Sequence, residues 1–369
     1  MKSMIRLLAS LLLLSAHAAA QAQSTDVVAE GFDTPWAMAA LPGGAWLVTE
    51  RGGAMRVVPA GAKRPGGPLQ GVPAVEAVGQ GGLLDVVLDS RFANNRQIYF
   101  CFTEKGEGAD RGKNGTALAR ARLNAAQTAL EEVQVIFRQH PKMSGRHHYG
   151  CRIAEMRDGT LAMTLGERFS GKDGAQTLDN HLGKIVRVDK SGKAPTDNPF
   201  LKTTGSLPEI YSIGHRNPQG LVVDSRGQLL AHEHGPQGGD ELNLVKAGRN
   251  HGWPVITHGR NYVSGTKIGE GETRADIEPA LHQWTPSIAP SGLAELSSDV
   301  YGADWKGSLF VGALKARTLF RLPFDGSRLT GAPQALLVDV GRLRDVRQGP
   351  DGYLYLLIED SGHILRVKP

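Results

Sequence analysis

The chain has 369 residues, of which 40% are hydrophobic, 21% are charged and 6% are aromatic. This balance is typical of a folded globular protein and excludes disorder caused by low hydrophobicity. The net charge is +5, or about +3 without two N-terminal basic residues, which gives no support to nucleic-acid binding. The 47 glycines show no collagen-like period, so we expect them to lie in turns.

The N-terminal segment has the pattern of a secretory signal peptide. Lys2 and Arg6 precede an apolar run at 7–14, and small residues with A-x-A cleavage sites follow. The apolar run is shorter than the ~20 residues that a spanning helix needs. We therefore expect residues 1–22 to be removed. The mature protein, residues 23–369, would be periplasmic or secreted, without stable membrane insertion.

A glycine turn followed by a short apolar strand recurs along the rest of the chain. Copies of this unit have their turns at positions 44, 159, 227, 307 and 352, and a copy without glycine has its turn at 96. Six units of this size match the ~40–50 residues of a four-stranded blade plus loops. A pair of β-sandwiches gives no reason for six copies of one hairpin. The sequence predicts an all-β fold over 23–369, a single six-bladed β-propeller of four-stranded antiparallel blades.

The chain has two cysteines, Cys101 and Cys151. An exported protein meets an oxidising compartment, where a disulfide between them can form. The sequence does not show how far apart the two residues lie, so the paired and the free forms both stay open.

Polar residues concentrate in segments that adjoin the repeated strands. The inner strands of a propeller surround one channel, so segments far apart in sequence can converge on one ligand. Arg216, Lys315, Arg342 and Arg344 would then surround an anion such as a carboxylate. A histidine among them, such as His148, could act as a neutral base with a lowered pKa. The alternative is that these arginines pair with nearby acids and that the histidine has no chemical role.

One turn is a candidate cation site. Gly235 and Pro236 could form an ordinary turn, although the backbone carbonyls of such a turn also suit a hard cation, and Asp240 and Glu241, which follow, could simply be solvated. A transition-metal site is the alternative, although no carboxylate geometry supports it. Its ligands would be His215, His232 and His234.

Several long motifs resemble the soluble aldose sugar dehydrogenases, relatives of the soluble quinoprotein glucose dehydrogenase. The resemblance covers nearly all of the mature chain. It implies a six-bladed propeller that holds pyrroloquinoline quinone (PQQ) and calcium (Ca2+) and oxidises the C1 hydroxyl of an aldose such as glucose to a lactone. It also implies an aldose sugar as substrate and an external electron acceptor, such as a cytochrome or a quinone. The motifs are Pro35–Met38, Gly79–Asp85, Asp179–Lys184, Gly214–Asn243, Gly248–Pro254 and Arg344–Gly352.

The resemblance also assigns roles to individual residues. His148 matches the catalytic base, in a His-aromatic-Gly-x-Arg pattern, and Arg216 lies beside the quinone carbonyl that receives the hydride. The other implied cofactor contacts are Gln80, Asn217, Lys315, Arg342 and Arg344, the last three facing the quinone carboxylates. The carbonyls of Gly235 and Pro236 match calcium ligands. A second, structural calcium site is matched by Asp240, Glu241 and the carbonyl of His251.

Some positions depart from the glucose enzyme. His147 replaces an acidic residue, so the partner that orients the base is not identified. His234 stands in place of a glutamine. The segment around Trp284 aligns only with a shift of one, so the residue that stacks on the quinone stays open. The dimer surface of that enzyme is not evident, so oligomeric state is left open.

Two other functions fit a propeller. A calcium-dependent sugar lactonase would need a cage of acidic and amide side chains on the axis, whereas this chain offers a basic set. A non-catalytic propeller would use the cationic residues to bind an acidic partner. The sequence names neither the preferred sugar nor the natural electron acceptor.

Overall fold

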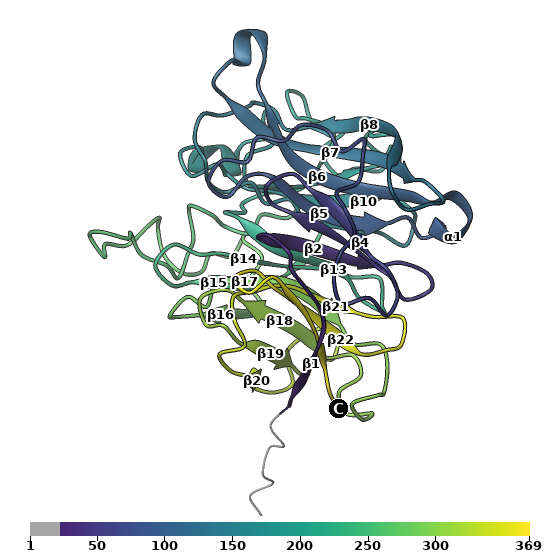
Figure 1. The fold of residues 1–369 in the computed structure, drawn as a ribbon. Helices are drawn as coiled ribbons and strands as arrows, with labels where there is room; N and C mark the ends of the chain where they lie inside the picture. The colour runs from purple at the N-terminus through teal and green to yellow at the C-terminus, as the bar shows by residue number, and fades with distance from the viewer. Residues whose placement is uncertain (1–22) are drawn as a thin grey trace, which may run out of the picture.

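The computed structural model describes residues 23–369, and the predicted signal peptide lies outside the described residues. The described chain forms six antiparallel sheets with very little helix (Figure 1). The six-bladed β-propeller expected from the sequence is confirmed. Five sheets have four strands, whereas the first blade has three, β2–β4.

The blades follow one another in chain order. The first blade holds β2 (Pro35–Ala40), β3 (Trp46–Glu50) and β4 (Met55–Val58). The second holds β5 (Leu83–Leu88), β6 (Gln97–Lys105), β7 (Asn114–Leu123) and β8 (Leu130–Arg138), with the short helix α1 (Phe92–Asn95) between its first two strands. The third holds β9 (Ile153–Glu155), β10 (Leu161–Leu165), β11 (Lys184–Val188) and β12 (Ile210–Ser212).

The other three blades complete the ring. The fourth holds β13 (Pro218–Val223), β14 (Leu229–Glu233), β15 (Asp240–Val245) and β16 (His282–Trp284). The fifth holds β17 (Pro290–Glu295), β18 (Leu309–Ala313), β19 (Leu319–Leu322) and β20 (Gln334–Leu337). The sixth holds β21 (Leu343–Gln348), β22 (Leu354–Ile358) and β23 (His363–Val367), and its outer strand is β1 (Thr25–Glu30).

The two ends of the chain close the ring together. The N-terminal strand β1 pairs antiparallel with the C-terminal strand β23, so the sixth blade contains both ends of the described chain (Figure 1). The inner strands β2, β5, β9, β13, β17 and β21 each contact the next, and β21 contacts β2. This closure brings loops from all six blades to one axis.

The repeated sequence unit is the second strand of each blade. The six turn positions precede β3, β6, β10, β14, β18 and β22. At the five glycines φ lies between 81° and 87°, a left-handed conformation that favours glycine. Arg96 takes the same region, with φ 55°, at the C-terminus of α1. Backbone conformation therefore explains why glycine recurs there and why one copy can lack it.

The core lies between neighbouring blades. Every residue of the second strands β3, β10, β14, β18 and β22 is buried, which explains their continuous apolar runs. Cys101 on β6 and Cys151 before β9 form a disulfide with Cα atoms 5.9 Å apart, so the second and third blades are covalently linked.

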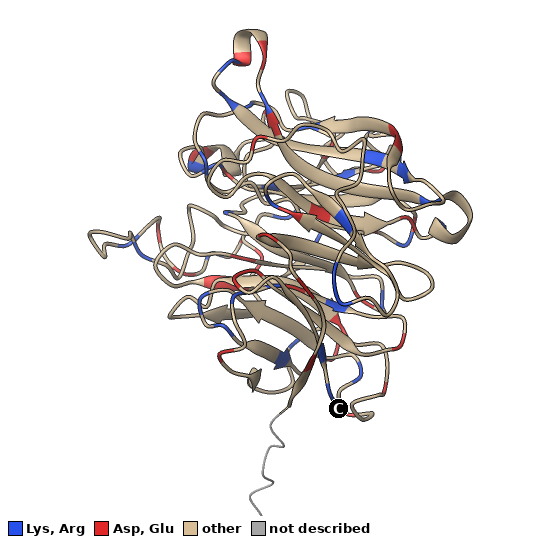
Figure 2. Ribbon diagram, viewed as in Figure 1, with Lys and Arg blue, Asp and Glu red and all other residues tan. Residues whose placement is uncertain are grey.

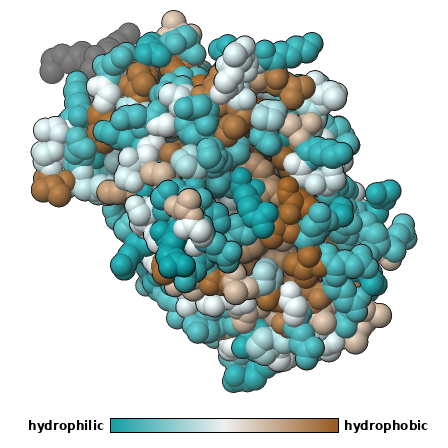
Figure 3. Space-filling view, turned by 90° about the horizontal axis from the view of Figure 1, so that it is seen from above, coloured by the Kyte–Doolittle hydropathy of each residue, from teal (hydrophilic) through white to brown (hydrophobic). Residues whose placement is uncertain are grey.

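Charged residues of both signs are distributed over all parts of the described chain (Figure 2). Basic and acidic residues are interspersed along the ribbon (Figure 2). Hydrophilic side chains cover most of the face in Figure 3, with apolar side chains in smaller groups. Within residues 23–369, no helix is long and apolar enough to cross a membrane.

Candidate active site

A cavity of about 230 Å³ lies where the six blades meet. Each blade contributes to its wall, through an inner strand or through a loop beside one. Its lining residues are Trp36, Arg51, Gln80, Leu84, Tyr149, Gly150, Asn217, Gln219, His234, Ala289, Leu314, Arg342, Arg344 and Glu359. Four of the residues proposed from the sequence to contact a cofactor therefore share one cavity: Gln80, Asn217, Arg342 and Arg344.

Of the other three residues proposed from the sequence for catalysis or cofactor binding, two lie directly beside the cavity wall and the third, Lys315, does not. His148 and Arg216 are buried and precede the lining residues Tyr149 and Asn217 in the chain. The side chain of Lys315 is exposed and does not line the cavity, although its neighbour Leu314 does.

His148 is held by contacts on both its backbone and its ring. It lies in the loop before β9 with φ 52°, an uncommon conformation for a residue other than glycine. Its backbone N–H donates to Gln80 Oε1 over 2.8 Å, and its Nδ1 lies 2.9 Å from Glu167 Oε1. A Cβ at Gly166 would lie 2.2 Å from the His148 carbonyl oxygen, so only glycine allows this approach.

The electrostatics of this pair favour a neutral imidazole. Burial, reinforced by Arg216, holds the pKa of His148 well below 6.5. Burial raises the pKa of Glu167 to about 7, against the lowering effect of Arg216. An ionised carboxylate can only accept, so it requires the proton on His148 Nδ1 and leaves Nε2 free to accept a proton. The exposed ring of Phe169 lies 5.4 Å from the His148 ring.

Glu167 is a site residue that sequence reasoning missed. The sequence left open which group orients the base, because His147 stands where an acid was expected. The structure supplies that acid from the loop after β10, not from the residue before the base. A matching signal existed, since His215 and Glu233 have nearly the same spacing in the next blade.

Arg216 is fixed by four acceptors on the fourth blade, one of which is the Tyr262 hydroxyl, 3.3 Å from Nη2. Its backbone N–H donates to Glu233 Oε2 over 2.5 Å, and its Nη1 donates to the carbonyls of His234 and Gly235 over 3.0 and 2.9 Å. Its guanidinium carbon lies 5.3 Å from the centre of the Trp253 ring. Its Nε is buried and finds no hydrogen-bond partner among residues 23–369.

An acid shares the cavity with the two arginines of the sixth blade. Arg344 Nε donates to Glu359 Oε2 over 2.6 Å, and Arg342 Nε lies 3.5 Å from Glu359 Oε1. Burial opposes ionisation of Glu359, but Arg344 and Arg342 lower its pKa below its ordinary value. The pairing of these arginines with an acid, considered from the sequence, therefore exists, and the acid is Glu359. Sequence reasoning missed Glu359, which reduces the local positive charge by one.

The candidate calcium turn is already tightly hydrogen-bonded. The Gly235 carbonyl accepts from Arg216, and its N–H donates to Asp240 Oδ1 over 2.9 Å. Asp240 Oδ2 accepts from the Ser287 hydroxyl over 2.7 Å and from the N–H groups of Ile288 and Ala289. Both carboxylate oxygens of Asp240 are thus engaged within the protein.

The residues of the second candidate calcium site adjoin a small void. Glu241 lies opposite Glu233 on the neighbouring strand, and burial together with Glu233 raises the pKa of Glu241 to about 8. His251 stacks on His215 with ring centres 4.7 Å apart. A void of about 10 Å³ is bordered by Gly235, Glu241 and His251. Within the described chain, no group of three or more His, Cys, Asp or Glu side chains is arranged to hold a metal.

The three histidines of the transition-metal alternative have separate partners. His215 Nε2 bonds Ser212 Oγ and its Nδ1 bonds Glu233. His232 Nε2 bonds the Gly292 carbonyl, and His234 Nε2 bonds the carbonyl of Pro290. Their rings therefore serve as hydrogen-bonding groups in the fourth blade.

These features define a propeller with a polar axial cavity and a buried histidine–carboxylate pair beside it. The family model described as Glucose / Sorbosone dehydrogenase matches residues 32–366, so the chain belongs to this family.

Individual relatives agree with the family match. The aldose sugar dehydrogenase YliI of Escherichia coli (strain K12) is 43% identical over 94% of this chain and 93% of its own. A crystal structure of a glucose dehydrogenase superposes with a TM-score of 0.89 at 42% identity, over 94% of this chain and 99% of the other. The PQQ-bound aldose sugar dehydrogenase of Streptomyces coelicolor superposes with a TM-score of 0.77 at 31% identity, over 94% and 98%.

Proposed function

We propose that this protein is a PQQ- and calcium-dependent aldose sugar dehydrogenase that oxidises the C1 hydroxyl of glucose-like sugars to lactones. The observation that carries the proposal is the His148–Glu167 pair beside an axial cavity with three arginines in its wall. The names of the relatives support the same reaction class. A lactonase is less well supported, because the cavity contains Arg51, Arg342 and Arg344 against the single acid Glu359.

The donors around the cavity suit an anionic quinone. Arg342 and Arg344 on the sixth blade supply guanidinium groups for carboxylates, and Lys315, after β18 on the fifth blade, would add an ammonium group. Gln80 and Asn217 add amides, and the buried Arg216 Nε is unpartnered in the described chain. The carbonyls of Gly235 and Pro236 would hold calcium together with the cofactor. A second ion would be held by Glu241, the His251 carbonyl and Asp240 Oδ1, which accepts a single hydrogen bond and keeps a lone pair. When bound, PQQ would supply the hydride acceptor.

The protein side of the chemistry is proton removal and charge stabilisation. His148 Nε2 would accept the proton of the sugar C1 hydroxyl, while Nδ1–H stays with Glu167. A positioned general base contributes typically ~10²–10⁴-fold to a rate. Arg216 keeps a fixed positive charge beside His148, where it would stabilise negative charge on a neighbouring oxygen without reorganisation. An external electron acceptor would then complete the cycle.

We also propose that the protein is exported, to the periplasm or beyond the cell. The N-terminal signal-peptide pattern predicts this, and the Cys101–Cys151 disulfide fits an oxidising compartment. The substrate would meet the enzyme outside the cytoplasm.

Reconstitution tests the proposed function. The protein is purified from a host that makes no PQQ, and glucose-dependent dye reduction is followed before and after adding PQQ with calcium. We expect no activity before addition, activity after it, and loss of activity on chelation. Full activity after exhaustive dialysis against chelator, without a quinone spectrum, would rule out this cofactor assignment.

A further inference from the structure

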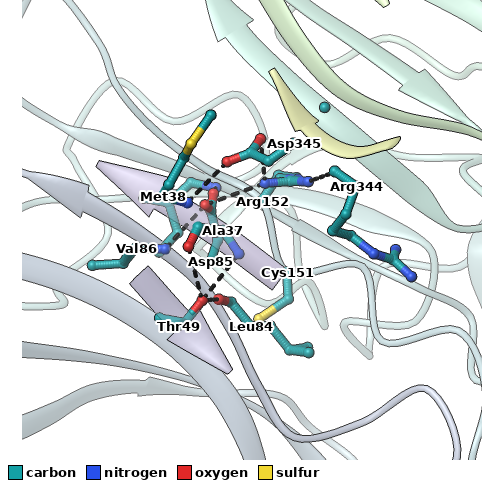
Figure 4. Close-up of polar contacts among 12 residues, drawn as sticks. Ala37, Met38, Thr49, Leu84, Asp85, Val86, Cys151, Arg152, Arg344 and Asp345 are labelled. Carbon is teal, nitrogen blue, oxygen red and sulfur yellow. Dashed lines mark hydrogen bonds and ion pairs between the residues drawn. The ribbon is translucent and has the colours of Figure 1, made fainter. Parts of the chain in front are cut away.

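A buried ionic cluster lies on the propeller axis, next to the cavity but outside its wall. Its members are two carboxylates, Asp85 on β5 and Asp345 on β21, and two guanidiniums, Arg152 before β9 and Arg347 on β21 (Figure 4 shows the first three). Arg152 Nη1 lies 3.0 Å from Asp345 Oδ1 and 3.4 Å from Asp85 Oδ1. Arg347 bonds the same two acids over 2.9 and 2.7 Å. The formal charges cancel.

Three of the four members are almost fully buried, while the Arg347 side chain is 22% exposed. Asp85, Arg152 and Asp345 are 0%, 2% and 1% exposed. Buried ion pairs are often no more stabilising than well-packed apolar side chains, because desolvation offsets the attraction. The stability of the fold therefore does not by itself explain why charges occupy this place.

Arg152 uses its remaining donors on residues that line the cavity. Its Nη2 donates to the carbonyl of Arg344 over 2.8 Å, and its Nε donates to the carbonyl of Gln219 over 2.8 Å. Its guanidinium carbon lies 4.1 Å from the centre of the Trp36 ring. These contacts join the third blade to the sixth, fourth and first, so one side chain supports three parts of the cavity wall.

The Arg344 backbone receives a second, independent support. The hydroxyl of Ser291 on β17 donates to the same carbonyl over 2.7 Å. The Arg344 side chain leaves this anchored backbone, passes 5.7 Å from the Trp36 ring centre and reaches Glu359 in the cavity. A fixed carbonyl limits where the guanidinium can go.

We propose that Arg152 is a positioning residue: held by Asp85 and Asp345, it anchors the Arg344 backbone and the Trp36 ring so that the Arg344 guanidinium is set to bind an anionic group of the ligand. The identity of that ligand, PQQ, rests on the proposed function. The anchoring itself is a property of the unliganded protein.

Three variants test the proposal. Arg152→Lys keeps the charge but loses the planar fork that serves two carbonyls at once. Ser291→Ala removes only the second donor to the Arg344 carbonyl. Arg321→Met is the matched control, since Arg321 is also buried, stacks 5.0 Å from a tryptophan ring, Trp305, and lies outside the cavity wall.

The first readout is the dissociation constant for PQQ, from absorbance titrations with calcium present. We expect a rise of about tenfold for Arg152→Lys and about threefold for Ser291→Ala, the size of one lost or weakened hydrogen bond. Turnover at saturating PQQ should change less than the dissociation constant. Arg321→Met should bind PQQ like the wild type, even if its melting temperature falls.

The second readout needs no ligand. Hydrogen exchange of the backbone over 343–348 should accelerate in Arg152→Lys and Ser291→Ala but not in Arg321→Met. Unchanged exchange and unchanged PQQ binding in the first two variants would overturn the proposal, as would equal weakening in all three. If Arg152→Lys does not fold, Ser291→Ala decides. If the wild type binds no PQQ, the proposed function fails and the exchange result still decides the anchoring.

Discussion

Two neighbouring blades contain nearly the same histidine–glutamate pair in different surroundings. His148 precedes β9 and bonds Glu167 after β10, while His215 precedes β13 and bonds Glu233 at the end of β14. The Nδ1–Oε1 distance is 2.9 Å in both pairs. Neither the sequence spacing nor the Nδ1–Oε1 distance therefore distinguishes the two pairs.

The second ring nitrogen separates the two pairs. His215 Nε2 bonds Ser212 Oγ over 2.8 Å and the residue is fully buried. No group among residues 23–369 is hydrogen-bonded to His148 Nε2, and the next residue, Tyr149, lines the cavity. A serine–histidine–glutamate row without solvent access can only hold structure, whereas a histidine with a free nitrogen beside a cavity can act as a base. Access to the cavity, rather than residue type, is what differs between the two histidines.

The largest effect should follow loss of the free nitrogen. In fully PQQ-loaded protein, His148→Gln should reduce sugar-dependent dye reduction by the ~10²–10⁴-fold typical of a lost general base. PQQ binding and melting temperature should stay close to wild type. Unchanged turnover in the loaded variant would remove His148 from the mechanism and end the distinction between the two pairs.

For stability, the larger loss should follow substitution of His215 rather than of His148. His215→Ala should lower the free energy of unfolding by about 2–4 kcal/mol, because it removes a buried hydrogen-bond partner from both Ser212 and Glu233 and opens a cavity. His148→Ala should cost clearly less, since it frees one carboxylate at the edge of the cavity. Urea unfolding of both variants measures the difference, and equal losses would contradict a purely structural role for His215.

Removing the orienting acid should have a moderate effect on rate. Glu167→Gln keeps the shape but loses the charged hydrogen bond to Nδ1. Such a bond is worth about 1.5–3 kcal/mol, or roughly ten- to a hundredfold in rate. Steady-state turnover with saturating PQQ measures this loss. A variant as active as wild type would show that His148 needs no orienting partner.

The pH profile of turnover should show whether Glu167 controls which nitrogen of His148 carries the proton. Burial raises the pKa of Glu167 to about 7 and holds that of His148 well below 6.5. As pH falls, the first proton therefore goes to Glu167, which then donates to Nδ1 and puts the histidine proton on Nε2. Turnover should fall with a midpoint near 7. In Glu167→Gln the midpoint should move below 6.5; an unmoved midpoint would assign this titration to another group.

The fold could be predicted from the sequence because the repeated turn and strand are each visible within a short stretch of chain. Each glycine turn with positive φ precedes a fully buried second strand, and both features are visible in a few consecutive residues. No comparable local pattern showed that the first blade would have three strands instead of four. The sequence could not predict whether Cys101 and Cys151 pair, because 50 residues separate them in the chain and only the closed ring brings them together.

The site was predictable only in part because its contacts cross blades. Gln80, Asn217, Arg342 and Arg344 share the cavity as expected, whereas the Lys315 side chain does not line it. Glu359 went unnoticed because an acid 15 residues after Arg344 meets it only when β21 and β22 pair. The contact of Arg152 with Arg344 spans 192 residues and depends on closure of the whole ring.

The most direct test of the account is a crystal structure of the protein with PQQ, calcium and a slowly oxidised sugar. We predict that PQQ occupies the axial cavity with a carboxylate at Arg344, and that the sugar C1 hydroxyl lies within hydrogen-bond distance of His148 Nε2. PQQ bound elsewhere, or a sugar whose C1 hydroxyl faces another group while His148 Nε2 stays unengaged, would contradict the assignment of His148 as the base.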